Sequence, residues 1–223
     1  MKIIFMHYRK CCILFLLMIL CNSLWSQVPV REEPRHKTVL ENDYVRLLDV
    51  HIKPGDTTLY HIHAAPSVIV HITKSTIGSQ VMGKPVTSPA EVLPGQTRFM
   101  GYDKTPITHR VYNAGKDVFH VMDIELVKKE PSNDSCAVLQ NKNIETTLNE
   151  KLVRVYKFDL PSLQTFAVPG GTCAHLLVCI AGEVNTTGKT ITPGEYIFFD
   201  PGTAVSVYNK RAGPATCVLL ELK

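Results

Sequence analysis

The sequence predicts an all-β protein built from two similar domains in tandem. Three observations carry this prediction: short stretches in which apolar and polar residues alternate, Pro-Gly turn signals between them, and an internal repeat. Alternation with a period of two is typical of strands with one buried face, and short strands closed by turns are typical of sandwiches and barrels. No segment has the length and the 3.6-residue period of a major helix.

The first 26 residues are predicted to be a signal peptide. Lys2, Arg9 and Lys10 precede an uninterrupted apolar run over residues 11–21, and small or polar residues follow it. The alternative is a membrane anchor, but the run is shorter than the ~20 residues needed to cross a bilayer. We therefore expect an exported protein, periplasmic or secreted, with no membrane attachment once the signal is removed.

Charge and composition exclude one class of partner. The chain is 45% hydrophobic and 20% charged, which is typical of a compact globular protein. Its net charge of +4 falls to +1 without residues 1–26, because three basic and no acidic residues leave. The basic character belongs largely to the signal peptide, so we expect no nucleic-acid partner.

Four cysteines remain after removal of the signal peptide: Cys136, Cys173, Cys179 and Cys217. In an exported protein this number permits up to two disulfides. Cys179 and Cys217 lie in apolar, strand-like stretches, which favours free buried thiols as the alternative for these two.

Strands are expected wherever β-branched and aromatic residues alternate with polar ones. The clearest stretches are Val45–Ile52, Ser67–Ile72, His109–Tyr112, Val118–Leu126 and Tyr196–Phe199. They are bounded by the turn signals Pro54-Gly55, Pro94-Gly95, Asn113-Ala-Gly115, Pro193-Gly194 and Pro201-Gly202.

The internal repeat divides the chain into two domains. A shift of 108 positions places seven residues between Thr38 and Ile72 on identical residues between Thr146 and Ile180, and a shift of 96 places Val111-Tyr-Asn113 on Val207-Tyr-Asn209. A polar stretch, residues 128–135, lies between the copies. We predict a signal peptide at 1–26, a first domain at 27–130, a linker at 131–145 and a second domain at 146–223.

Histidines at metal-ligand spacing occur in the first copy only. Gly55 precedes His61-Ile-His63 by six residues, and His109 is followed by Asn113 four residues later. Residues i and i+2 of a strand point to the same face, so His61 and His63 project side by side, and His109 can meet them from another strand. Asn113 itself reads as a turn residue.

The repeat and these two motifs resemble the cupin superfamily, specifically the two-domain cupins (bicupins). The resemblance covers most of the mature chain and implies two tandem β-barrels of the jelly-roll, or double-stranded β-helix, type. The glutamate that usually follows the His-x-His pair is missing, since Ser67 and Val68 occupy its positions, and the lead-in to the second motif reads Lys104-Thr-Pro106. The resemblance supports the fold more strongly than any one activity, because this scaffold carries many functions.

His61, His63 and His109 are therefore the predicted metal ligands. Imidazoles suit iron, nickel, copper and zinc alike, so the sequence leaves the identity of the divalent transition metal open. Without the glutamate, neutral histidines would leave the metal's charge uncompensated, which favours an anionic, chelating small molecule as the ligand. Should a fourth protein ligand exist, His71 is the first substitute.

Other polar residues of the first copy have more ordinary interpretations. His51 and His120 are expected to be polar or half-buried strand residues. Arg98, Tyr102 and Tyr112 are candidates for lining the mouth of the site, with surface exposure or core packing as the alternative for each.

The second copy is predicted to have lost the site. The same shifts place Pro169 and Gly171 opposite His61 and His63, and Val205 opposite His109. His175 falls opposite Ser67, and one imidazole holds no metal without partners. We expect a degenerate, structural barrel whose interior is filled by side chains.

Two functional hypotheses follow. In the first, an exported mononuclear metal-binding bicupin acts as a three-histidine, dioxygenase-like oxidoreductase on a small acidic chelating substrate, as the resemblance implies. In the second, the protein binds a metal or a small ligand without turnover, because neither histidine motif contains a carboxylate to act as a general acid or base. The sequence assigns no catalytic residue and no organic cofactor, and a homodimer is the expected assembly if one forms.

Overall fold

The computed structural model describes residues 27–128, 130–131, 136, 138–140, 143–186 and 188–223. The predicted signal peptide, residues 1–26, lies outside the described residues. Nineteen strands and one short 3-10 helix make up the described part, so the prediction of an all-β protein is confirmed. Within these residues no helix is long and apolar enough to span a bilayer.

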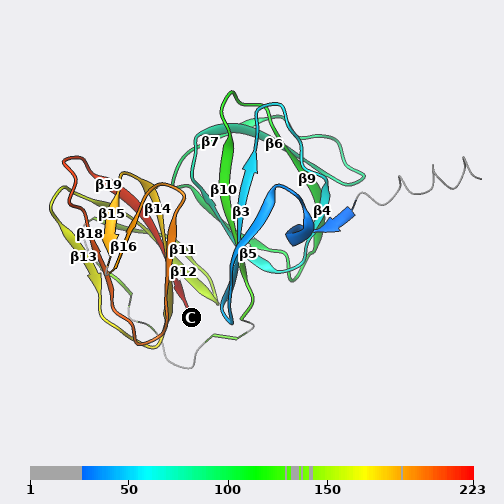
Figure 1. Cartoon of the computed structure of the whole chain (residues 1–223). Helices are drawn as coiled ribbons and strands as arrows, with labels where there is room; N and C mark the ends of the chain where they lie inside the picture. The colour runs from blue at the N-terminus through cyan, green and yellow to red at the C-terminus, as the bar shows by residue number, and fades with distance from the viewer. Residues whose placement is uncertain (1–26, 129, 132–135, 137, 141–142, 187) are drawn as a thin grey trace, which may run out of the picture.

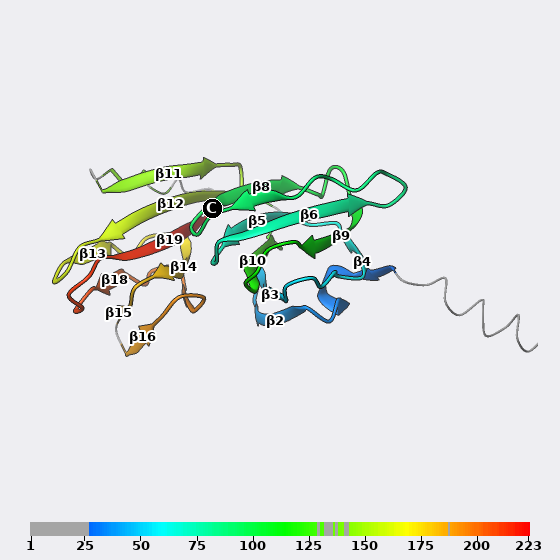
Figure 2. The same ribbon diagram turned by 90° about the horizontal axis from the view of Figure 1, so that it is seen from above.

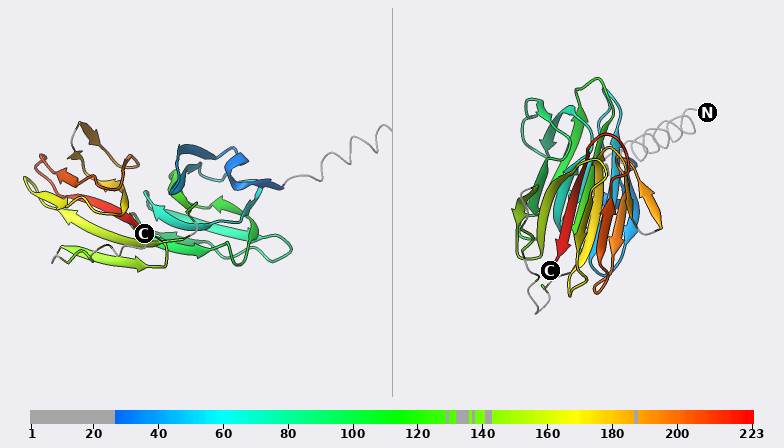
Figure 3. Two further views of the ribbon diagram at one scale, coloured as in Figure 1. Left: turned by 90° about the horizontal axis from the view of Figure 1, so that it is seen from below. Right: turned by 90° about the vertical axis from the view of Figure 1, so that its left-hand side faces the viewer.

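Two β-barrels lie side by side, the first in blue to green and the second in yellow to red (Figure 1). Figure 2 shows them end to end along the long direction of the molecule, with the C-terminus between them. In the right-hand panel of Figure 3 the second barrel lies in front of the first. The prediction of two tandem barrels of the cupin type is confirmed.

The first barrel consists of two five-stranded sheets. One sheet has the order β1-β4-β9-β6-β7, with β1 Gln27–Pro29, β4 Tyr60–His63, β9 Ile107–Asn113, β6 Ser75–Val81 and β7 Ala90–Val92. The other has the order β2-β3-β10-β5-β8, with β2 His36–Glu41, β3 Val45–Ile52, β10 Phe119–Leu126, β5 Pro66–His71 and β8 Thr97–Gly101. The 3-10 helix η2, Val30–Glu32, connects β1 to β2.

The second barrel repeats this topology without the β1 strand. Its five-stranded sheet has the order β11-β12-β19-β14-β17, with β11 Ile144–Asn149, β12 Val153–Leu160, β19 Ala215–Leu222, β14 Ala174–Ala181 and β17 Tyr196–Phe199. Its four-stranded sheet has the order β13-β18-β15-β16, with β13 Thr165–Val168, β18 Val205–Tyr208, β15 Val184–Thr186 and β16 Lys189–Ile191. Strand β11 begins at Ile144, inside the stretch predicted as linker.

The repeat extends to local irregularities of the backbone. The pairing of β2 with β3 shifts register between Thr38 and Leu40, and the pairing of β11 with β12 shifts between Thr146 and Leu148, which are the repeat-related residues. The turn glycines Gly55 and Gly95 have positive φ angles of 74° and 76°, a backbone region that favours glycine.

The barrels pack against each other through the sheet β2-β3-β10-β5-β8 of the first and the sheet β11-β12-β19-β14-β17 of the second. The largest apolar cluster contains residues of both copies, among them Leu47, Val70 and Ile124 of the first and Leu176 and Leu220 of the second. Sheets with an apolar outer face must bury it against another layer, and here each barrel covers the other. Separate clusters fill the interior of the second barrel and part of the interior of the first.

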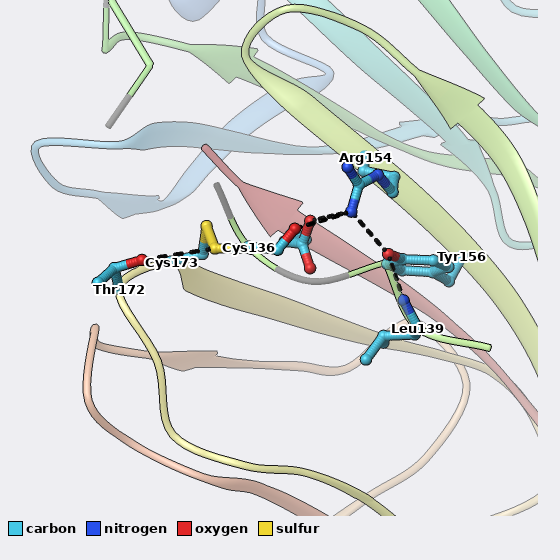
Figure 4. The surroundings of a disulfide bond; sticks show 7 residues. Cys136, Leu139, Arg154, Tyr156, Thr172 and Cys173 are labelled. Atoms are coloured by element: carbon cyan, nitrogen blue, oxygen red, sulfur yellow. Dashed lines mark hydrogen bonds and ion pairs between the residues drawn. A yellow bond between two sulfur atoms is a disulfide. The ribbon is translucent and has the colours of Figure 1, made fainter. Parts of the chain in front are cut away.

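One disulfide joins Cys136 to Cys173, the residue before β14 (Figure 4). Cys179 and Cys217 are free and buried, as their apolar surroundings indicated. Beside the disulfide, Arg154 pairs with Glu221 at 2.9 Å and donates a hydrogen bond to the hydroxyl of Tyr156 at 3.2 Å (Figure 4). The disulfide and a hydrogen bond from the backbone of Leu139 to the hydroxyl of Tyr156, at 3.1 Å, attach Cys136 and Leu139 to the five-stranded sheet of the second barrel.

Candidate metal centre

His61 and His63 point into the first barrel from β4. The strand alternates, with His61 fully buried, Ile62 36% exposed and His63 4% exposed. This is the period-two pattern expected of a strand with one face inward.

His109 joins them from the neighbouring strand β9, where it lies directly opposite His61. The ring centroids are 4.9 Å apart for His61 and His63, 4.7 Å for His61 and His109, and 4.9 Å for His63 and His109. The structure thus brings the three predicted residues together in a nearly equilateral triangle. Metal binding by them stays a prediction.

A fourth imidazole, His36, completes the cluster, and the sequence analysis missed it. His36 begins β2, and its ring centroid lies 4.7 Å from that of His61 and 6.4 Å from that of His63. Ring nitrogens of His36, His61 and His63 all lie within 4.8 Å of one another. His71, the first substitute, instead packs against Phe119 with ring centroids 5.7 Å apart, so the structure favours His36 as the fourth ligand.

Oxygen atoms contact the Nδ1 atoms of two of these rings. The Nδ1 atom of His61 lies 2.9 Å from the carbonyl oxygen of Leu59, and the Nδ1 atom of His36 lies 2.8 Å from a carboxylate oxygen of Glu33. Such contacts fix the tautomer and aim the other ring nitrogen, Nε2, at a metal. The Nε2 atoms of His61 and His109 are buried and have no hydrogen-bond partner, so the residues present fit a metal ion.

Burial keeps the three predicted ligands in the form that binds metals. Desolvation, followed by repulsion from neighbouring histidines, lowers the pKa of His61 to about 3 and that of His63 to about 2. Burial and His36 lower the pKa of His109 to about 4. All three are therefore neutral near pH 7, as a metal requires.

Two carboxyl groups, Glu33 and Asp123, lie beside the histidines, and the expectation of an uncompensated metal did not include them. Burial opposes ionisation of Glu33, but hydrogen bonds from His36 and from the backbone of Arg35 and Leu59 lower its pKa to about 2. Asp123, fully buried on β10, places an oxygen 3.4 Å from the Nδ1 atom of His63. Burial, with repulsion from Glu125, raises the Asp123 pKa to about 7.

Asp123 lies close to the place where the sequence lacks the expected glutamate. Ser67 and Asp123 come from the paired strands β5 and β10, and both residues are buried. Val68 faces the other way, into the core between the barrels. Neither histidine motif contains a carboxylate, as the sequence indicated, but Asp123 brings a carboxyl group to the site from a strand outside both motifs.

A cavity of about 470 Å³ opens beside the histidines. Its walls are mostly aliphatic and aromatic, and its polar lining includes Asp123, His71, Arg98 and Tyr102. Arg98 and Tyr102 thus line the cavity as proposed. Tyr112 does not, because its hydroxyl donates to the carbonyl oxygen of Thr87 and its ring packs over Gly78.

Asn113 acts as a turn residue, as predicted. It is buried, its side-chain amide donates to the carbonyl oxygens of Ile52 and Asp117, and its side-chain oxygen accepts from the backbone of Gly115. These bonds close the turn that follows the strand of His109.

In the second barrel the equivalent positions hold no ligand set. The strand register places Val168, and not Pro169, opposite Val205, so Val168 is the structural equivalent of His61. The correction arises because the first copy has one more residue between Thr57 and His61 than the second copy has between the equivalent residues Thr165 and Val168. His175 is buried with unpartnered ring nitrogens, and an apolar cluster fills the barrel interior, as expected of a structural copy.

Comparison with known proteins identifies the fold. No family model matches the sequence, and no curated protein matches it. Among solved structures, the bacterial pirin YhhW from Escherichia coli in complex with nickel(II) is 16% identical and matches 84% of this chain and 90% of its own, with a TM-score of 0.59. A cupin 2 conserved barrel domain protein from Leptotrichia buccalis is 7% identical, matching 83% and 87% with a TM-score of 0.53.

A salicylate 1,2-dioxygenase from Pseudaminobacter salicylatoxidans is similar as well. It is 10% identical, and the match covers 84% of this chain and 76% of that one, with a TM-score of 0.56. Identities this low show a shared fold and nothing finer. The chain has the fold of the cupin proteins, and its histidine cluster defines the site from which a function must be argued.

Proposed function

We propose that this protein is a mononuclear metal-binding bicupin whose metal is held by His61, His63 and His109, with His36 as a fourth ligand. The observation that carries the proposal is the cluster of imidazoles inside the first barrel, in which His61, His63 and His109 lie 4.7–4.9 Å apart by ring centroids and His36 lies 4.7 Å from His61. Buried polar atoms without partners are rare, and His61 and His109, which are directly opposite each other on β4 and β9, each have such an atom at Nε2. One of the similar structures contains nickel(II), which supports the same chemistry.

A small acidic molecule with apolar bulk fits the cavity best. The aliphatic walls favour an apolar body, while Arg98 lies at the lining, and its side chain forms no hydrogen bond or ion pair with the described part of the chain. A guanidinium group binds a carboxylate strongly, in a bidentate manner. Tyr102, whose ring centroid is 4.9 Å from that of His63, supplies a hydroxyl near the histidines.

Turnover of that molecule is the enzymatic form of the proposal. A bound divalent metal supplies Lewis-acid chemistry, and iron or copper adds electron transfer. Asp123, close to His63 and with a pKa of about 7, is placed to hold or release a proton at the same site. The similarity to a salicylate 1,2-dioxygenase makes an aromatic 2-hydroxy acid a reasonable first substrate to test.

The alternative is metal or ligand binding without turnover. Four histidines around one ion leave fewer open coordination positions than three do, and this favours a binding role. Measurements of ligand binding and oxygen consumption on one protein sample distinguish the two hypotheses.

The test loads the mature protein with iron(II), nickel(II), copper(II) or zinc(II) in turn and titrates it with salicylate. We expect salicylate to bind metal-loaded wild type and not the metal-free protein, and Arg98→Gln to weaken binding. Oxygen consumption by the iron form would support the dioxygenase-like hypothesis, and tight binding without consumption would support the second. Equal binding with and without metal would contradict the proposed site.

Export is a separate part of the proposal. The charged start and the short apolar run of residues 1–26 support a signal peptide, and the disulfide Cys136–Cys173 is typical of oxidising compartments. Mass spectrometry of the native N-terminus tests this, with a mature start near residue 27 expected. Protein that keeps residues 1–21 in the membrane fraction would contradict it. Homodimer formation stays a prediction.

A further inference from the structure

A second group of potential metal ligands lies outside the first barrel, on the face that turns toward the second. Asp49 and His51 on β3 alternate with Leu48, Val50 and Ile52, which pack inside the first barrel. Leu47, on the same face as Asp49 and His51, packs in the core between the barrels. The two polar residues therefore sit where that apolar interface ends.

His120 of β10 completes the group. It lies directly opposite His51 in the strand register, and the two rings stack with centroids 4.0 Å apart. The Nε2 atoms of His51 and His120 lie 3.1 Å and 2.7 Å from the same carboxylate oxygen of Asp49. Potential ligand atoms of all three residues lie within 4.8 Å of one another.

The arrangement repeats that of the main site in its strand geometry. In both groups, two ligands stand at positions i and i+2 of one strand and a histidine stands directly across the neighbouring strand. The main site uses His61, His63 and His109 in this way, and the outer group uses His51, Asp49 and His120. Strand positions of this kind give rigid spacing, because side chains of residues i and i+2 point to one face.

Contacts with the second barrel hold the outer group in place. A Cβ atom on Gly194 would lie 2.3 Å from the ring of His120, so the imidazole rests directly on the turn before β17. Gly194 also has a φ of 85°, which favours glycine there. Burial opposes ionisation of Asp49, but the hydrogen bond from His120 and the nearby His51 lower its pKa, so its carboxylate is charged.

We propose that Asp49, His51 and His120 form a second, zinc-binding site at the junction of the two barrels. Two imidazoles and one carboxylate are ligands that zinc favours, and a water molecule completes its tetrahedral coordination. The His51 side chain is 51% exposed, which leaves an open side for entry of the ion and for that water. Hard cations such as magnesium and calcium prefer all-oxygen sites and fit less well.

The structural consequence is a firmer junction. A zinc ion would fix the ring of His120 against Gly194, and so it would couple the first barrel to the turn of the second. The site is independent of the proposed function, because none of its residues lines the central cavity.

The second barrel offers a matched control. The repeat places Asp159 and Thr216 at the positions of His51 and His120, and Thr216 donates a hydrogen bond to Asp159 at 2.7 Å. This pair has one potential ligand instead of three. Asp159→Asn should therefore leave zinc binding unchanged.

The experiment titrates metal-free mature protein with zinc chloride by calorimetry and counts bound ions by native mass spectrometry. We expect His51→Ala and Asp49→Asn each to bind one zinc fewer than wild type, and the double variant His61→Ala/His63→Ala to retain the zinc that His51→Ala loses. Zinc should also raise the thermal midpoint of that double variant, since an ion bound only by the folded state stabilises it.

The outcomes separate the two sites. If His51→Ala binds as many zinc ions as wild type, the second site is refuted, and the three residues form hydrogen bonds only. If His61→Ala keeps every bound metal while His51→Ala loses one, the second site stands and the proposed function fails. His51 is chosen because its side chain is 51% exposed, whereas His120 is also packed against Gly194.

Discussion

At the residue scale, the chemistry of the histidine cluster depends on the oxygen atoms that contact its Nδ1 atoms. His36 contacts Glu33, His61 contacts the Leu59 carbonyl and His63 approaches Asp123. Burial keeps His61, His63 and His109 neutral, and the Glu33 carboxylate supplies negative charge beside His36 in a cavity of low dielectric. The ligand set and its compensating charges come from four separate stretches of the chain.

The role of Asp123 is tested by Asp123→Asn, which keeps the shape of the side chain and removes its charge. We expect the affinity for divalent metal to fall about 10- to 100-fold, as is usual for groups that orient a metal ligand. A competition titration against a chelator measures it. Asp103→Asn, at an exposed turn, is the control and should have no effect. Unchanged affinity in Asp123→Asn would mean that its contact with His63 does not matter for binding.

The stability of the metal-free protein should fall between pH 7 and pH 5. The pKa values of His61, His63 and His109 lie below that of a free histidine, so the unfolded chain takes up protons first and stability is lost as the pH falls. The loss is on the order of 2 kcal/mol per fully buried histidine at pH 5. Urea unfolding at several pH values measures it.

Asp123 changes the stability in the opposite direction between pH 7 and pH 5, and this provides an internal check. Its raised pKa means that the folded state holds a proton that the unfolded state has released, so it gains stability as the pH falls toward 5. Asp123→Asn removes that term, and we expect a steeper acid loss than in wild type. A flat profile in both proteins would contradict neutral, buried histidines.

Sequence reasoning found His61, His63 and His109 because each lies in a motif with local spacing. His36 and Asp123 carry no such signal: they stand on β2 and β10, remote from the motifs, and only the strand register brings them to the cavity. The same limit applies to the outer histidines. His51 and His120 read as ordinary strand residues until the pairing of β3 with β10 places them opposite each other.

At the element scale, paired asparagines hold the ends of the equivalent strands β9 and β18. Asn113 bonds to Ile52, Asp117 and Gly115. Asn209, its partner in the repeat, donates to the carbonyl oxygens of Leu160 and Gly213 and accepts from the backbone of Arg211. The sequence repeat is visible at these positions because both barrels use an asparagine side chain to form hydrogen bonds with the backbone of the turn after the strand.

The two asparagines allow a matched comparison. Asn113→Ala and Asn209→Ala should each lower the free energy of unfolding by roughly 2–4 kcal/mol, because buried backbone groups lose their partners. Asn113→Ala should also weaken metal binding, because Asn113 is the last residue of the strand that carries His109. Asn209→Ala should leave metal binding unchanged. Chemical unfolding and metal titration of both variants provide the measurement. Equal effects on metal binding would show that the turn does not position β9.

Strand prediction succeeded where alternation was strong. The predicted strand Val45–Ile52 and the predicted strand Tyr196–Phe199 agree with β3 and β17 to the residue. The short strands β1, β7, β15 and β16, each of three residues, were not foreseen, because three residues carry too little alternation. The register of β13 was misplaced by one residue because a constant sequence shift cannot detect the extra residue that the first copy has between Thr57 and His61.

At the scale of the whole molecule, the two barrels share a core and have different interiors. The first barrel keeps a cavity lined by five histidines, and the second is filled by its own apolar cluster. Between them, residues of both five-stranded sheets form the largest apolar cluster of the described chain. The degenerate copy therefore stabilises the copy that carries the site.

This shared core predicts cooperative unfolding. Leu220 packs between the barrels and Leu219, its neighbour on β19, packs inside the second barrel. Leu220→Ala and Leu219→Ala should each cost about 2–5 kcal/mol, and both should lower the temperature at which metal is released from the first barrel. Calorimetry combined with a metal-sensitive dye tests this. A separate, unshifted transition for metal release in Leu219→Ala would show that the barrels unfold independently.

Metal content tests whether His61, His63 and His109 of the first barrel hold a metal and the second barrel holds none. Wild type, His61→Ala, His63→Ala, His109→Ala and His175→Ala are purified without a histidine tag, and bound metal per protein is measured by elemental analysis and native mass spectrometry. We predict that the first three variants each lose one equivalent relative to wild type and that His175→Ala loses none. If His175→Ala lost the metal, or if the three variants kept it, the assignment of the site to the first barrel would be wrong.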